Sequence, residues 1–146
     1  MSTASPLPVV AAIDLAEMTD YVLAEALAEA AQRQAPMIHV ACAIDPSLDV
    51  IGVDIELADE VPRLEQALEA RVAGPLAGVP HEVHALLGAP ATEIVELARR
   101  VEAGLIVVGR HSRAQPAAVL GSVPAKILAL AHSSVLVVQP TDYATP

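Results

Sequence analysis

Segments with the pattern of buried strands alternate with segments of helical periodicity along almost the whole chain. The strand-like segments are short and mostly apolar, and they cover residues 8–13, 37–43, 82–87, 105–108 and 134–139. Strands that alternate with helices imply right-handed crossovers and a mostly parallel sheet covered on both faces. The sequence therefore predicts an α/β fold, a three-layer α/β/α sandwich.

Four segments between the strands carry apolar residues three or four positions apart, as an amphipathic helix requires. The helices are expected at about residues 18–35, around Val61, Leu64, Leu68 and Val72, around Ile94, Leu97, Ala98 and Val101, and from Ser122 and Pro124 onward. The acidic stretch from Ile44 to Glu60 follows neither period and is the least predictable part of the chain.

Length and charge restrict the class of protein. A chain of 146 residues suits a single domain spanning residues 1–146, with its core at about residues 7–140. The formal net charge of −10 argues against nucleic-acid or membrane binding, because either needs a basic face. Cys42 is the only cysteine, so we expect a small buried hydrophobe and no disulfide. With no leader or membrane-spanning stretch recognised, a cytoplasmic location is expected.

Candidate binding residues follow the first, second and fourth strands, because ligands of open parallel sheets bind beyond the carboxyl ends of the strands. They are Asp14, the region from Ala41 to Ile44, and the loop from Gly109 to Ser122. That loop ends at a helix N-terminus, which favours phosphate, with Gly121 and Ser122 beside it. The alternative is an ordinary helix N-cap. Arg110, His111 and Arg113 concentrate basic side chains in the same loop and favour an anion or an acidic partner.

Other chemistry finds less support in the sequence. His81 and His84 are three positions apart, so in a strand they point to opposite faces and cannot share a metal. His39 is expected to be a hydrogen-bonded histidine of the core or sheet face. Neither a calcium loop nor a serine-hydrolase arrangement is found. We therefore predict no catalytic residues and no metal-ligating residues.

Several blocks of sequence resemble the universal stress protein family in order and spacing. They are LIVVG at 105–109, LGSV at 120–123, KIL at 126–128 and SVLVV at 134–138, with GAPA at 88–91 and residues 10–17 upstream. The resemblance implies a five-stranded, adenine-nucleotide-hydrolase-like sheet of strand order 3-2-1-4-5. It also implies a homodimer formed through the last strand, from Ser134 to Gln139.

In one branch of the family, ATP is held by the motif G-x-x-G, nine residues, then Gly-Ser/Thr. The resemblance and the basic loop together nominate nine positions for nucleotide binding: Asp14, Val40, Gly109, Arg110, Ser112, Arg113, Gly121, Ser122 and Val123. This chain departs from the motif in two ways: Ser112 replaces the second glycine, and eight residues rather than nine precede Gly121. The phosphate cradle is therefore altered.

The resemblance and the candidate residues together predict a stress-response module that binds ATP, with Mg²⁺ on the phosphates, and that acts through an unknown protein partner. The alternative is a dimeric adaptor or chaperone-like protein of the same fold that binds no nucleotide. We expect no enzymatic activity beyond slow ATP hydrolysis, for which the sequence assigns no base.

Overall fold

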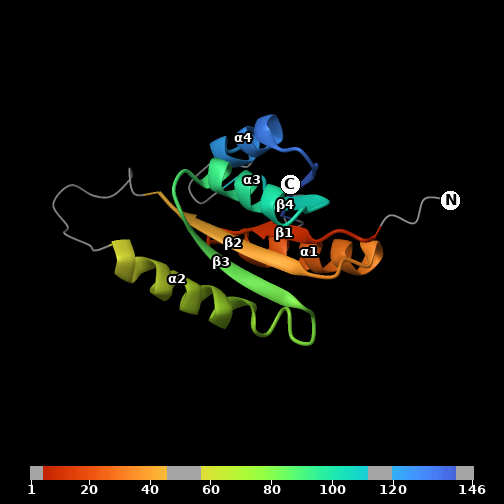
Figure 1. Ribbon diagram of the computed structural model, residues 1–146, viewed down its shortest axis with the longest axis horizontal. Helices are drawn as coiled ribbons and strands as arrows, with labels where there is room; N and C mark the ends of the chain where they lie inside the picture. The colour runs from red at the N-terminus through yellow and green to blue at the C-terminus, as the bar shows by residue number, and fades with distance from the viewer. Residues whose placement is uncertain (1–4, 46–56, 112–119, 141–146) are drawn as a thin grey trace, which may run out of the picture.

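The computed structural model describes residues 5–45, 57–111 and 120–140, with only the backbone described at 57 and 58. Strands and helices alternate strictly within these residues (Figure 1). The elements are β1 (Val9–Ala12), α1 (Thr19–Arg33), β2 (Ile38–Ile44), α2 (Leu57–Val72), β3 (His81–Leu87), α3 (Pro90–Arg100), β4 (Leu105–Gly109), α4 (Ser122–Leu130) and β5 (Ser134–Val138).

The five strands form one parallel sheet in the order β3-β2-β1-β4-β5. This confirms the predicted α/β class and strand order. The chain first builds outward from β1 through β2 to β3, and then returns to the other side of β1 to place β4 and β5. The strand order therefore reverses between β1 and β4, where a doubly wound sheet opens a crevice at the carboxyl ends of its strands.

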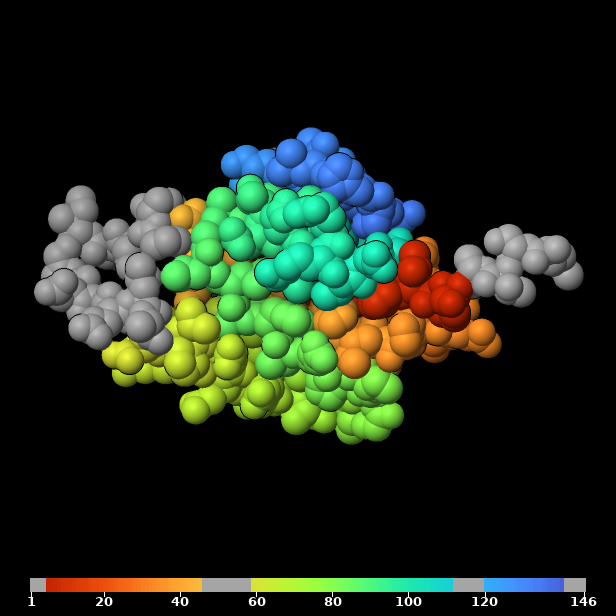
Figure 2. Space-filling model, viewed as in Figure 1, coloured from red at the N-terminus to blue at the C-terminus, as the bar shows by residue number. Residues whose placement is uncertain are grey.

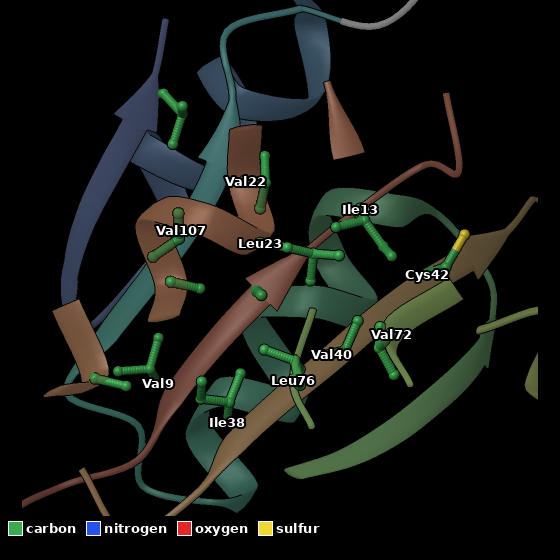
Figure 3. Packing of buried hydrophobic residues seen from close by; sticks show 14 of the residues in the cluster. Val9, Ile13, Val22, Leu23, Ile38, Val40, Cys42, Val72, Leu76 and Val107 are labelled. Carbon is green, nitrogen blue, oxygen red and sulfur yellow. The ribbon is translucent and has the colours of Figure 1, made fainter. Parts of the chain in front are cut away.

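Helices cover both faces of the sheet (Figure 1). Alternate residues of β1 explain how: Val9 and Ala11 face the cluster that includes α1 and α2, while Val10 and Ala12 face the cluster that includes α3 and α4. The space-filling view shows α4 at the top of the molecule and α2 at the bottom, with α3 between them (Figure 2). Within the first cluster, Ile38, Val40 and Cys42 lie in a row along β2 (Figure 3).

The central strands β1 and β4 are buried at every position, whereas β3 and β5 lie at the sheet edges and are partly exposed. This is why the apolar runs of β1 and β4 are unbroken and that of β3 alternates. Within the described residues, none of the helices combines the length and apolar character that crossing a bilayer requires.

The largest difference from the sequence expectation concerns α2. It begins at Leu57, inside the acidic stretch, four residues before the apolar periodicity starts at Val61. Asp59 and Glu60 lie in its first turn, where carboxylates interact favourably with the helix dipole. Acidic residues that look like a loop in the sequence therefore begin the helix. Residues 46–56 of the stretch lie outside the described residues.

Candidate ligand-binding site

A cavity of about 170 Å³ lies at the carboxyl ends of β1, β2 and β4, where the strand order reverses. Most of its lining is apolar, and four residues with polar side chains border it: Asp14, Thr19, Cys42 and His111. The other lining residues are Ala12, Ile13, Met18, Val22, Ala43, Pro90, Ile94, Val108, Gly109, Val123 and Pro124. An apolar pocket with a few polar groups is typical of a small-molecule site.

Asp14 forms one wall of the cavity, directly after β1, and its side chain is exposed. Its Oδ1 accepts a hydrogen bond of 2.9 Å from the backbone N–H of Ala16. Leu15, between these two residues, has a φ of 61°, in the left-handed region that costs a non-glycine residue about 1 kcal/mol or more. The turn that leads from β1 into α1 thus fixes Asp14 at the mouth of the cavity.

The first residues of α1 supply a second wall. Met18 is the N-cap residue and is buried, and Thr19, the first residue of the helix, is fully buried and also lines the cavity. The Thr19 hydroxyl has no hydrogen-bond partner within the described part of the chain. A buried hydroxyl without a partner costs about 1–3 kcal/mol, so a ligand that bonded to Thr19 would recover that energy.

The end of β2 contributes Cys42 and Ala43. Burial, with a smaller contribution from the negative charge of Asp14, raises the pKa of the Cys42 thiol to about 11. The thiol is therefore protonated at neutral pH and is a poor nucleophile. Asp14 and Cys42 both line the cavity.

The remaining wall comes from β4, the residues that follow it, and the start of α4. Gly109 lines the cavity, and a Cβ at this position would lie 2.9 Å from the Cβ of Met18. The glycine is therefore required by the close approach of α1, whatever else it does. His111 is buried and also lines the cavity.

Arg110 and Gly121 hold the two ends of the loop that precedes α4. The Gly121 N–H donates to the Arg110 carbonyl at 2.8 Å, and the Arg110 N–H donates to the Val138 carbonyl at 3.0 Å. Gly121 is the N-cap residue of α4, with a φ of −64°, and no side chain caps the helix. Ser122 is exposed and is the first residue of α4, so the capping role considered for it is not observed.

Three of the nine nominated residues line the cavity: Asp14, Gly109 and Val123. Arg110, Gly121 and Ser122 lie beside it, at the two ends of the loop. Ser112 and Arg113 lie outside the described residues. Val40 does not line the cavity, because β2 continues to Ile44 and Val40 is fully buried between Ala11 of β1 and Val83 of β3.

Thr19 lines the cavity but was not among the residues nominated from the sequence. Its place in the first turn of the helix after β1 was a usable signal, because that turn also faces the crevice of a doubly wound sheet. His111 drew attention as a basic neighbour of the loop but was not nominated as a binding residue, although it is buried against the cavity.

The sequence matches the model of the universal stress protein family over residues 7–139. The chain belongs to the universal stress protein family. Comparison with curated proteins gives no match. The fold also agrees with solved structures of the family, among them universal stress protein UspA from Lactobacillus plantarum, with a TM-score of 0.76 and 20% sequence identity, covering 94% of this chain and 100% of that one.

Two other solved structures of universal stress proteins contain an adenine nucleotide. One, in complex with cAMP, is 26% identical with a TM-score of 0.67, and the match covers 93% of this chain and 98% of that one. The other, from Archaeoglobus fulgidus in complex with dAMP, is 23% identical with a TM-score of 0.59, and the match covers 91% of this chain and 98% of that one. The second likeness is evidence for the shared fold alone.

Proposed function

We propose that this universal stress protein binds an adenine nucleotide in the cavity at the β1/β4 crevice. The observation that carries the proposal is the cavity itself: it opens where the strand order reverses, and it joins an apolar lining to Asp14 and the start of α4. The relative solved with cAMP, which is 26% identical, supports adenine as the base.

The apolar part of the cavity suits the faces of a purine ring, and the polar groups at its margin suit the edges of the base or the ribose. Asp14 is exposed at the mouth and offers carboxylate oxygens, which accept hydrogen bonds. The Thr19 hydroxyl can donate or accept. These two side chains are the ones we assign to the nucleoside part of the ligand.

The phosphates would lie toward α4. The first backbone N–H groups of a helix have no partners within the helix, and the helix dipole favours an anion there. Val123 and Pro124 of the first turn line the cavity, and Ser122 adds an exposed hydroxyl. ATP accompanied by Mg²⁺ remains the form that we predict, with the metal held mainly by phosphate oxygens, because Asp14 is the only carboxylate that the described residues place in the lining.

We propose a regulatory binding module rather than an enzyme, as the sequence also led us to expect. Asp14 lies at the mouth, and the Cys42 thiol is kept protonated by its raised pKa. Nucleotide binding would act by changing the surface offered to a partner protein. The adaptor alternative, in which no nucleotide binds, is kept as the outcome that a negative titration would favour.

Calorimetric titration of the dialysed full-length protein with ATP, with and without Mg²⁺, tests the proposal, with adenosine and GTP as comparison ligands. We expect micromolar ATP binding and weaker GTP binding. Asp14→Asn should weaken ATP and adenosine alike. Absence of heat with every adenine ligand would contradict the proposal and favour the adaptor.

Ser122→Glu separates the phosphate site from the nucleoside site. A glutamate at this exposed first position suits the helix dipole, so the fold is retained, but its charge repels phosphate. We expect about a tenfold or greater loss of ATP affinity, with adenosine unaffected. Ala125→Glu, also exposed on α4, is the matched control. Equal losses in both variants would argue against phosphate at the α4 N-terminus.

A further inference from the structure

A second group of polar side chains lies at the other end of the sheet, near the amino-terminal ends of β2 and β3. In the register of these strands His39 pairs with Glu82, and His84 follows two positions later on the same face of β3. β3 is an edge strand, so the group is open on one side. His39 is buried, His84 is partly buried and Glu82 is exposed.

The side chains converge on one point. His39 Nδ1 lies 2.9 Å from His84 Nε2, and Glu82 Oε2 lies 3.6 Å from the first nitrogen and 3.8 Å from the second. A metal ion about 2.0–2.2 Å from each of three ligands requires ligand atoms roughly 3.0–3.5 Å apart. The observed separations reach that range with small side-chain rotations.

We propose that His39, Glu82 and His84 form a binding site for a divalent transition-metal ion such as Zn²⁺. Two imidazole nitrogens and one carboxylate oxygen are ligands that suit Zn²⁺ and are unsuited to Mg²⁺ or Ca²⁺, which prefer oxygen alone. Three protein ligands leave at least one coordination position for water or an added ligand. The site is independent of the nucleotide cavity, which lies beyond the opposite ends of the strands.

The charges at the site favour a cation. Burial is the main cause that lowers the pKa of both His39 and His84, which favours the neutral form of each imidazole. The Glu82 carboxylate supplies a negative charge and acts against that lowering at both rings. Arg100 on α3 contributes an opposing positive charge near His84, from an exposed position.

His81 and His84 both lie in β3, where their spacing of three positions keeps them from sharing a metal, as predicted from the sequence. His81 Nδ1 donates instead to the Val79 carbonyl at 2.7 Å, and its side chain is on the opposite face of β3 from that of His84. The prediction of no metal-ligating residues treated His39 only as a hydrogen-bonded histidine of the core or sheet face, because only the register of β2 and β3 brings His39 and His84, 45 positions apart, into contact. We replace that prediction with the present site.

The test is calorimetric titration of tag-free, EDTA-treated and dialysed full-length protein with Zn²⁺, with Co²⁺ as a visible-absorption probe. We expect one Zn²⁺ ion to bind per chain at this site, with an affinity that millimolar Mg²⁺ does not change. Glu82→Gln, an exposed change that spares the fold, should weaken binding by about tenfold or more, as should His84→Ala. The matched control is His81→Ala, on the same strand but the opposite face.

Thermal unfolding without metal will show that the Glu82→Gln chain is folded, and added Zn²⁺ should then raise the melting temperature of wild type more than that of the variant. Equal Zn²⁺ affinity in wild type, Glu82→Gln and His84→Ala would overturn the proposal, since the ion would then be bound elsewhere. Failure of wild type to bind Zn²⁺ or Co²⁺ would also overturn it and leave the two histidines a hydrogen-bonded pair only.

Discussion

Gly109 illustrates how one residue can have both a packing role and a ligand-binding role. The family resemblance nominated it as part of a phosphate cradle, and the structure shows Met18 packed where a side chain would be. The neighbour is the Cβ of Met18, close to the backbone of α1, so it cannot swing away as the end of a flexible side chain could. Loss of binding in a Gly109 variant would therefore not by itself identify a ligand contact.

Gly109→Ala should lower the free energy of unfolding by about 1–3 kcal/mol, because the added methyl overpacks the wall between β4 and α1. Urea denaturation measures the loss. In a Met18→Gly background the same change should cost less, since the obstructing Cβ is then absent. If the cost is the same in both backgrounds, the contact with Met18 is not its cause.

Cys42 should be nearly inert toward alkylation in the folded protein. Its pKa of about 11 lies above the usual 9.0, so at pH 8 the thiolate fraction falls by about 100-fold. Labelling with iodoacetamide in native buffer and in urea gives the comparison within one protein, and only the unfolded chain should react at the ordinary rate. Equal rates in the two solutions would refute the raised pKa.

The same shift has a stability consequence with a definite sign. The folded state holds the Cys42 proton to a higher pH than the unfolded state does, so this group's contribution is fully present below about pH 9 and is lost as the pH rises toward 11. The free energy of unfolding is measured against pH for wild type and for Cys42→Ala, and the difference between the two curves isolates the contribution. A difference that stays flat from pH 8 to pH 11 would count against it.

At the scale of elements, the periodicity of the sequence predicted the five strands and four helices. Strands that are buried on both faces appear as unbroken apolar runs, and helices with one buried face carry apolar residues three or four positions apart. The periodicity predicted the start of α2 too late in the chain. Asp59 and Glu60 of its first turn interact with the helix dipole and do not contribute to the apolar periodicity. The position of Asp14 and of the start of α4 followed from the rule for parallel sheets. The unpartnered hydroxyl of Thr19 and the contact between His39 and His84 depend on packing and register, which one sequence does not reveal.

Apolar packing, rather than the ion pair between the helices, should hold α2 on the sheet. Arg71 of α2 and Asp20 of α1 form a pair of 2.7 Å, but Asp20 is 71% exposed. Asp20→Asn should therefore cost less than about 1 kcal/mol. Leu68→Ala, at a fully buried position of the same helix, should cost about 2–5 kcal/mol. Urea denaturation of both variants should reproduce this order, and a larger loss for Asp20→Asn would reverse the argument.

At the scale of the whole molecule, β5 leaves an unusual surface at one edge of the sheet. Val135, Leu136 and Val137 are only partly buried, and α4, which precedes this strand, exposes Leu128 and Leu130, each at 48%. An apolar strand at an open edge is a template for pairing with another chain. A homodimer formed through the strand from Ser134 to Gln139 would bury this surface, as the sequence also led us to expect.

Substitutions of exposed leucines can test the dimer prediction. Sedimentation equilibrium of the full-length protein should give a dimer at micromolar concentration, and the double variant Leu128→Glu/Leu130→Glu should weaken the association by about tenfold or more, because it places charges beside the interface. Leu87→Glu provides the matched control, since Leu87 is 42% exposed at the end of β3, on the other edge of the sheet. A monomeric wild type would contradict the prediction, and equal weakening by Leu87→Glu would move the interface to the β3 edge, where Glu82 and His84 lie.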